Sequence, residues 1–231
     1  QHNVRDQNSS GVLKLHSIAD AAIQVYSSPS NDLDHKTHVI PAFIPASSVS
    51  IVDSDIRKEL SVYNNVIVSI ATHPKNKTVQ IDGKDIYGFD LILDAYSKIS
   101  KKGMILVLID SNGSSREDYQ SEIQKINAAG QPVKYISSTT DFNALLQLCS
   151  VYVRPTRSDG DSIAIREALA AGVKVLASDC VIRPEGVALF NNNDPRSLEI
   201  ELNKLLDVPN SPPFVQNDFS GQVLELYRTI S

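Results

Sequence analysis

Two acidic side chains, Asp159 and Glu167, stand eight positions apart around the start of a predicted helix. The residues three and four positions before and after Glu167 are all isoleucine or alanine, so its neighbours on the helix surface are apolar or small. Because burying an unpaired carboxylate costs several kcal/mol, Glu167 should either pair with a cation or receive the hydroxyl groups of a ligand. The position of Asp159 favours the ligand-binding role for Glu167, because Asp159 lies in the loop before the helix and can reach over the same helix end. The cations that could pair with Glu167 instead are Arg154, Arg166 and Arg183.

The elements that must position these acids form a strand, a loop, a helix and a second strand. A β-branched run ends at Pro155, a polar loop contains Gly160, a helical pattern covers residues 162–172, and an apolar run follows at 173–177. Parallel sheets bind ligands at the carboxyl end of the first strand of such a unit, where the helix N-terminus offers unpaired N–H groups. In this chain that place is residues 157–163.

The rest of the chain repeats this alternation. Further strands are predicted at 66–71, 104–109, 133–136 and 187–190, and further helices at 90–99, 119–129, 142–149, 195–206 and 218–230. Asp141 and Asp194 stand at N-cap positions, with Pro195 first in its helix. Near the N-terminus we expect a helix at 11–22, strands at 23–27 and 38–44, and a short helix that ends at Leu60. The fold class is therefore α/β, a Rossmann-like parallel sheet with helices on both faces.

One known family has this motif. The spacing of Asp159 and Glu167, followed by Ala168-Leu-Ala-Ala-Gly172 and Val175-Leu-Ala-Ser-Asp179, resembles the acidic motif of retaining glycosyltransferases of family 4. These enzymes have the two-domain GT-B fold, and the motif lies in the C-terminal domain, which binds the nucleotide-sugar donor. The other similar segments, which extend the resemblance over most of residues 64–206, are Tyr87 to Ala95, Arg183-Pro-Glu-Gly186, Val187 to Phe190 and Asn193-Asp-Pro195.

The resemblance implies roles for individual residues. Glu167 would bind the ribose hydroxyls of the donor, and Asp159, which stands where the family usually has Glu, would act on the transferred sugar as the catalytic residue. The nucleobase would lie near the backbone of Ser137, while the side chains of Ser137 and Ser138 are interpreted as turn residues. The side chain of Asp161 would repel a diphosphate and is expected to point away. The backbone amides implied to lie near the sugar and diphosphate are those of Gly160, Asp161, Ser162 and Ile163.

The chain departs from the family pattern at the cations that bind the diphosphate. The usual Gly-Arg after the first strand is Ala71-Thr72 here, and the usual Lys before the next helix is Tyr87. Each charge-assisted hydrogen bond to a diphosphate contributes roughly 1.5–3 kcal/mol, so a donor site should present at least one cation. We expect Lys84 and Arg157 to supply it. The other candidates are Lys75, Lys77, Arg154 and Arg183.

Composition restricts the partners and the location. The net charge of -5 and the absence of a long Lys/Arg run argue against nucleic acid as the main partner. No apolar run approaches the ~18 residues that span a bilayer, and no signal peptide is visible. Cys149 and Cys180 are interpreted as reduced thiols of a cytoplasmic protein. The five histidines lack ligand spacing, so we expect no metal site. The resemblance implies no cofactor, with the nucleotide sugar as substrate.

The start of the chain bears on its domain organisation. Because the first residue is Gln1 and the only methionine is Met104, we expect residues to precede this chain. The resemblance implies that they form an N-terminal domain that binds the acceptor and contacts the inner face of the membrane. Residues 1–45 would be the remnant of that domain and its hinge, and residues 46–231 the nucleotide-sugar-binding domain with a C-terminal helix. That helix either crosses back to the first domain or packs on its own sheet.

The function implied is donor binding by a retaining glycosyltransferase. It would transfer a hexose from a UDP- or GDP-linked donor to a polysaccharide, such as a capsular polysaccharide, or to a lipid-linked acceptor, and this chain alone would be inactive. One alternative is a non-catalytic Rossmann-like binding or scaffold domain that has lost donor chemistry, which the missing Arg and Lys favour. Another is a sugar-nucleotide enzyme of a different reaction type, such as an epimerase.

Overall fold

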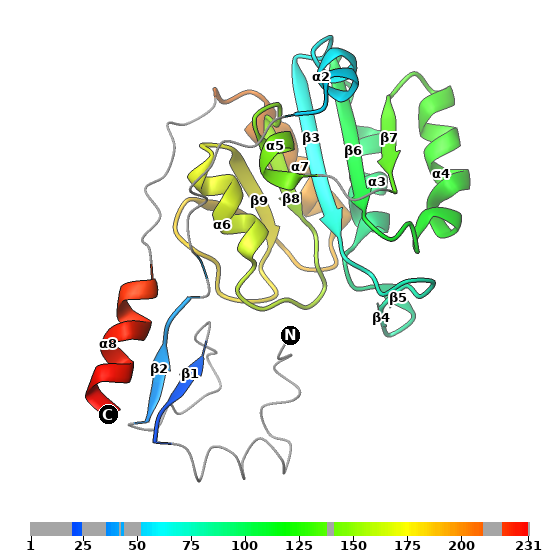
Figure 1. Ribbon diagram of the computed structural model, residues 1–231. Coiled ribbons are helices and arrows are strands. Elements are labelled where there is room, and N and C mark those ends of the chain that lie inside the picture. The colour runs from blue at the N-terminus through cyan, green and yellow to red at the C-terminus, as the bar shows by residue number, and fades with distance from the viewer. Residues whose placement is uncertain are drawn as a thin grey trace.

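The structure, a computed structural model, describes residues 20–24, 36–41, 43, 52–137, 141–209 and 219–230. Within these residues, six parallel strands form one sheet in the order β10-β9-β8-β3-β6-β7 (Figure 1). This is the strand order of a doubly wound sheet, and the order reverses between β3 and β8, which is the topological switch point. The strands are β3 (Asn65–Ala71), β6 (Met104–Asp110), β7 (Val133–Ile136), β8 (Val151–Arg154), β9 (Lys174–Ser178) and β10 (Val187–Phe190).

Helices cover both faces of this sheet, each over its own apolar core (Figure 1). One face carries α3 (Phe89–Lys98), α4 (Arg116–Ala128) and α7 (Pro195–Leu206). The other carries α2 (Ser54–Leu60), α5 (Phe142–Leu146) and α6 (Ile163–Ala170). Successive strand residues contribute to opposite cores, as the two-residue period of a strand requires: Val151 and Val153 face α3, while Tyr152 faces α5 and α6.

The predicted α/β fold is confirmed, and most differences are at the ends of elements. Asp194 caps α7 by accepting hydrogen bonds from two backbone N–H groups, and Asp141 caps α5 in the same way with one. Helix α4 begins at Arg116, three residues before its predicted start, and α5 ends at Leu146 rather than at Cys149. The helix predicted at residues 11–22 lies almost wholly outside the described residues, as does Ser138.

The predicted loop 72–87 contains a short antiparallel hairpin, β4 (Gln80–Ile81) and β5 (Lys84–Asp85), which the sequence analysis missed. Its last residue, Asp85, is buried and fastens the hairpin to the start of α3. The Asp85 carboxylate accepts hydrogen bonds from the backbone N–H groups of Tyr87 (2.9 Å) and Phe89 (3.3 Å) and from the hydroxyl of Tyr119 (3.0 Å). These contacts fix Tyr87 at the carboxyl edge of the sheet.

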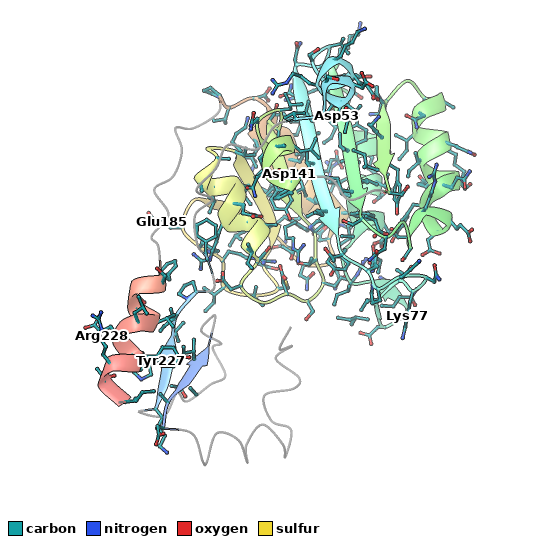
Figure 2. All side chains as sticks on the ribbon, in the orientation of Figure 1. Asp53, Lys77, Asp141, Glu185, Tyr227 and Arg228 are labelled. Carbon is teal, nitrogen blue, oxygen red and sulfur yellow. The ribbon has the colours of Figure 1, made fainter. Side chains whose placement is uncertain are left out.

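A second, smaller group of elements lies apart from the six-stranded sheet (Figure 1). Strands β1 (Ala22–Gln24) and β2 (Thr37–Val39) pair in parallel, and α8 (Ser220–Ile230) lies beside β2. Figure 2 shows Tyr227 and Arg228 projecting from α8 in this region. Of the two placements predicted for the C-terminal helix, the structure therefore has it beside the N-terminal strands rather than on the large sheet. Residues of β2 and α8 line a groove of about 500 Å³, formed by Thr37, His38, Val39, Ile40, Gln222, Glu225, Leu226 and Thr229.

None of the helices in the described part of the chain is both long enough and apolar enough to pass through a membrane.

Candidate functional site

The loop between β8 and α6 contains most of the residues singled out from the sequence. Ser162 begins α6 as its N-cap, and its hydroxyl accepts a hydrogen bond from the backbone N–H of Ile165 at 3.4 Å. The side chain of Ile163 is half exposed, at 50% of its full accessible area. The first turn of α6 therefore faces outward at the carboxyl edge of the sheet, where a helix N-terminus favours a negative charge.

Asp159 lies in this loop with its carboxylate between two arginines. Arg154 donates from Nε (3.1 Å) and Nη2 (3.0 Å), Arg183 donates from Nη1 (2.7 Å), and the hydroxyl of Thr156 donates at 3.2 Å. Burial alone would raise the pKa of Asp159, but the two guanidinium groups outweigh it and lower the pKa to about 2. Asp159 is therefore an ionised acceptor whose two oxygens are both occupied by this chain's own side chains.

Glu167, in the second turn of α6, has a different environment. Its Oε1 accepts a hydrogen bond from Nδ2 of Asn143 on α5 at 3.1 Å, and the residue is only partly buried. Burial raises the pKa of Glu167; the bond from Asn143 opposes this, and the nearby Asp141 adds to it. Figure 2 shows Asp141 at α5, next to α6. Glu167 thus keeps acceptor capacity for a ligand.

The arginines proposed as alternative partners of Glu167 pair with other acids. Arg154 and Arg183 bind Asp159, and Nε of Arg166 donates to both oxygens of Asp161 at 2.8 and 2.9 Å. The alternative that one of these three arginines forms an ion pair with Glu167 is therefore wrong. The Asp161 side chain is directed to Arg166, whose guanidinium carbon lies 5.5 Å from the centroid of the Phe219 ring, just before α8.

The two cations expected at the diphosphate have contrasting environments. Arg157 is buried, with 3% of its side chain exposed, and donates to both oxygens of Asp90 (2.8 and 2.6 Å), to Oδ1 of Asn193 (2.7 Å) and to the carbonyl of Asp85. It fastens the loop after β8 to the start of α3 and has little donor capacity left. Lys84 is exposed on β5, and Figure 2 shows Lys77 on the same side of the molecule, away from α6.

Ser137, at the end of β7, is exposed, and its hydroxyl accepts a hydrogen bond from Nη1 of Arg116 at 3.4 Å. This contact gives Ser137 a local partner at the carboxyl edge of the sheet.

Comparison with known proteins identifies the family. A family model described as glycosyl transferases group 1 matches residues 81–208, which is more than half of the chain. The chain belongs to the group 1 glycosyl transferases. A glycosyltransferase of Haemophilus influenzae described as uncharacterized is 26% identical over 129 residues, which cover 50% of this chain and 36% of that protein.

Solved glycosyltransferases of the GT-B fold share the architecture of this group 1 glycosyl transferase. HepE of Anabaena, in complex with UDP-glucose, has a TM-score of 0.64 at 16% identity, with 85% of this chain and 57% of HepE covered. The UDP-forming α,α-trehalose-phosphate synthase of Burkholderia xenovorans has a TM-score of 0.55 at 15% identity, with 68% of this chain and 38% of the synthase covered. The chain spans a little over half of HepE and about a third of the Haemophilus relative.

Two residues of this group 1 glycosyl transferase make contacts in the site that the sequence did not predict, Asn143 with Glu167 and Arg154 with Asp159. Asn143 is the hydrogen-bond partner of Glu167, and nothing in its sequence context signals this, since α5 and α6 meet only in the folded chain. Arg154 did carry a signal: it is the charged residue at the carboxyl end of β8, directly before Pro155. Its guanidinium lies beside Tyr87, the residue that stands in place of the family's Lys.

In the described part of this group 1 glycosyl transferase, no cluster of three or more His, Cys, Asp or Glu side chains could hold a metal ion. Cys149 and Cys180 are both free thiols.

Proposed function

We propose that this chain is the donor-binding domain of a retaining glycosyltransferase that transfers a hexose from a nucleotide sugar to a polysaccharide or lipid-linked acceptor. The observation that carries the proposal is Glu167, a partly exposed carboxylate with one amide partner, beside the outward-facing first turn of α6. A carboxylate in this state can accept hydrogen bonds from two ribose hydroxyl groups. Asn143 would hold the carboxylate in position for them.

UDP is the nucleotide that the comparisons favour. The Anabaena neighbour was solved with UDP-glucose, and the Burkholderia neighbour is described as UDP-forming. GDP remains the second candidate from the sequence analysis. In the proposed reaction the leaving diphosphate gains negative charge, and the protein's contribution is to hold and stabilise that charge at the carboxyl edge of the sheet.

A preceding domain is part of the proposal. Strands β1 and β2 form a two-stranded parallel sheet, whereas parallel strands normally belong to larger sheets with both faces covered. This supports residues 1–45 as the end of an acceptor-binding domain, with α8 joining it to the donor domain. The complete enzyme would act in the cytoplasm, at the inner face of the membrane when its acceptor is lipid-linked, for example in capsular polysaccharide synthesis.

The test is an isothermal titration of the full-length protein with UDP-glucose. Glu167→Ala should weaken binding by roughly 1–3 kcal/mol, about 5-fold to 150-fold, because it removes the acceptor for the ribose hydroxyls. The matched control is Glu201→Ala on α7, a partly exposed carboxylate paired with Lys204, and this variant should bind as the wild type does. Equal affinities of the Glu167 variant and the wild type would remove the ribose role.

The scaffold alternative, which the missing family Arg and Lys favour, has a second observation in its support. The carboxylate of Asp159 is occupied by Arg154, Arg183 and Thr156, so it is not free to contact a sugar unless these bonds rearrange. A folded full-length protein that binds none of UDP, GDP and ADP in the same titration would support the scaffold over the transferase.

A further inference from the structure

The ion cluster around Asp159 is unbalanced in charge. Arg154 and Arg183 are both ion-paired to this one carboxylate, so two guanidinium groups face one negative charge and one positive charge remains. The side chains are 13%, 2% and 9% exposed for Arg154, Arg183 and Asp159, so solvent compensates this charge poorly. A buried excess charge is costly unless an opposite charge joins it.

Neighbouring acids do not supply that opposite charge, because they have partners of their own. Asp161 is paired with Arg166. Asp85 receives the hydrogen bonds at the start of α3 and that of Tyr119, and burial raises its pKa, which disfavours its charged form. Tyr87, over whose ring the Arg154 guanidinium lies, is neutral at neutral pH like any tyrosine, and burial raises the pKa of its hydroxyl further.

Arg154 lies where a doubly wound sheet binds its ligand. Strands β3 and β8 pair through only two residues of each, whereas β3 and β6 pair through seven, so β3 and β8 separate toward their carboxyl ends. Nη1 of Arg154 donates to the carbonyl of Ile70 on β3 at 3.4 Å, and its guanidinium carbon lies 5.4 Å from the centroid of the Tyr87 ring. The cation therefore spans the topological switch point, which is the ligand-binding crevice of such sheets.

Arg154 also has donors to spare. A guanidinium has five N–H groups. Among the described residues Arg154 uses one on Nε and one on Nη2 for Asp159 and one on Nη1 for Ile70, which leaves one on each terminal nitrogen. Arg183 is more fully engaged, with bonds to the Ser178 carbonyl, Asp159 and the Thr156 hydroxyl. Arg154 is thus the member of the pair that can contact a ligand.

A second buried donor lies close to Arg154. The residue Tyr152 is fully buried, and its hydroxyl makes no hydrogen bond with any described residue. Burial raises the pKa of Tyr152 to about 12, and Arg154 is near enough to oppose this rise. The Tyr152 hydroxyl therefore lies beside the Arg154 guanidinium, and an anion at this place would meet both groups.

We propose that Arg154 is the cation that contacts the diphosphate of the donor, with Arg183 adding a second positive charge behind it. Asp159 then acts as a positioning residue that holds both guanidinium groups, rather than as a residue that touches the sugar. This assignment rests on the proposed function and moves the diphosphate contact from Lys84 and Arg157 to Arg154.

The experiment compares UDP with uridine, which lacks the diphosphate, in titrations of the full-length protein. Arg154→Gln should weaken UDP binding by about 10-fold to 100-fold and change uridine binding by less than about 2-fold, because only UDP offers the anion. Arg154→Lys keeps the positive charge but loses the planar guanidinium. Its affinity for UDP should therefore lie between those of the wild type and of Arg154→Gln. The matched control is Arg196→Gln, an exposed arginine paired with Glu199, which should leave both ligands unaffected.

Arg154→Gln should fold, because it leaves Arg183 and Asp159 as a balanced pair. If thermal unfolding shows that it does not fold, the test uses Arg154→Lys instead. A loss of UDP affinity larger than the loss of uridine affinity in that variant supports the assignment. Unchanged UDP binding by the folded variant, or an equal loss of UDP and uridine binding, overturns the assignment while the proposed function stands. A wild-type protein that binds neither ligand overturns both.

Discussion

At the scale of single residues, identical chemical groups have opposite environments. Asp159 and Glu167 are both carboxylates on one loop–helix unit, yet the pKa of Asp159 is lowered to about 2 and that of Glu167 is raised. Two guanidinium groups bind the first, and among the described residues a neutral amide, that of Asn143, donates to the second. Asp159 is therefore suited to organising cations and Glu167 to receiving neutral hydroxyl groups.

Asp159→Asn should destabilise the fold more than any other single change in this cluster. It leaves two buried guanidinium groups without a counter-charge, which costs about 3–5 kcal/mol, whereas Arg154→Gln leaves a balanced pair and should cost less. Urea unfolding of both variants beside the wild type measures the difference. An Asp159→Asn protein as stable as Arg154→Gln would contradict the charge imbalance.

The same prediction has a pH signature. The pKa of Asp159 is about 2 in the folded state against 3.8 for the free group, so the unfolded state takes up a proton first as the pH falls. The stabilisation by the ionised carboxylate is fully present above pH 4 and is lost between about pH 4 and pH 2, with a magnitude of roughly 2 kcal/mol. Asp159→Asn should lack this part of the pH dependence in the same urea experiments.

At the scale of elements, the site depends on a close approach between α3 and the end of β8. Gly88 is the N-cap of α3 with φ +70°, and a Cβ there would lie 2.0 Å from the carbonyl oxygen of Pro155. The same junction is fastened by Arg157, whose side chain pairs with Asp90 on α3. The element packing therefore fixes where the loop after β8 begins, and with it the positions of Arg154 and Asp159.

A comparison of Gly88→Ala with Gly130→Ala separates the cost of this close packing from the cost of a positive φ. Gly130 also has a positive φ, +84°, but a Cβ there would meet nothing within 4 Å. Gly130→Ala should therefore cost only the left-handed conformation, roughly 1–2 kcal/mol, while Gly88→Ala should cost roughly 3 kcal/mol or more because the strand end must move. Denaturant unfolding measures both, and equal losses would mean that the approach of α3 to β8 is not tight.

At the scale of the whole molecule, the chain contains a large sheet with its helices and a small group made of β1, β2 and α8 (Figure 1). Both large apolar cores are built from residues between Ile56 and Leu206. The contact of Arg166 on α6 with Phe219 before α8 links the two parts. Because Arg166 also holds Asp161, this contact joins the small group to the loop of the candidate site.

A fragment of residues 52–209 should consequently fold by itself. It keeps both apolar cores and loses the contact of Arg166 with Phe219, so it should show one cooperative unfolding transition and lose at most about 2 kcal/mol of stability. Phe219→Ala in the complete chain is the control that isolates this contact. A fragment without a cooperative transition would show that β1, β2 and α8 are needed for the large sheet.

The order of strands and helices could be predicted from sequence because their signals are local. The apolar run at 104–109 and the cap Asp194 each specify an element through residues within a few positions. The β4–β5 hairpin was missed, because each of its strands has only two residues and no alternation to detect. The boundary between residues 45 and 46 stays a prediction, as do the roles of Gly160 and Ser137.

The sequence by itself determined the α/β class, the spacing of the two acids around the start of α6, and the family resemblance, since all three are properties of neighbouring residues. Only the tertiary structure decided that Arg154 and Arg183 pair with Asp159, Arg166 with Asp161, and Asn143 with Glu167. The charges permit several pairings of the same arginines and acids. The choice among them is made by which strand ends and helices the folded sheet brings within hydrogen-bond distance.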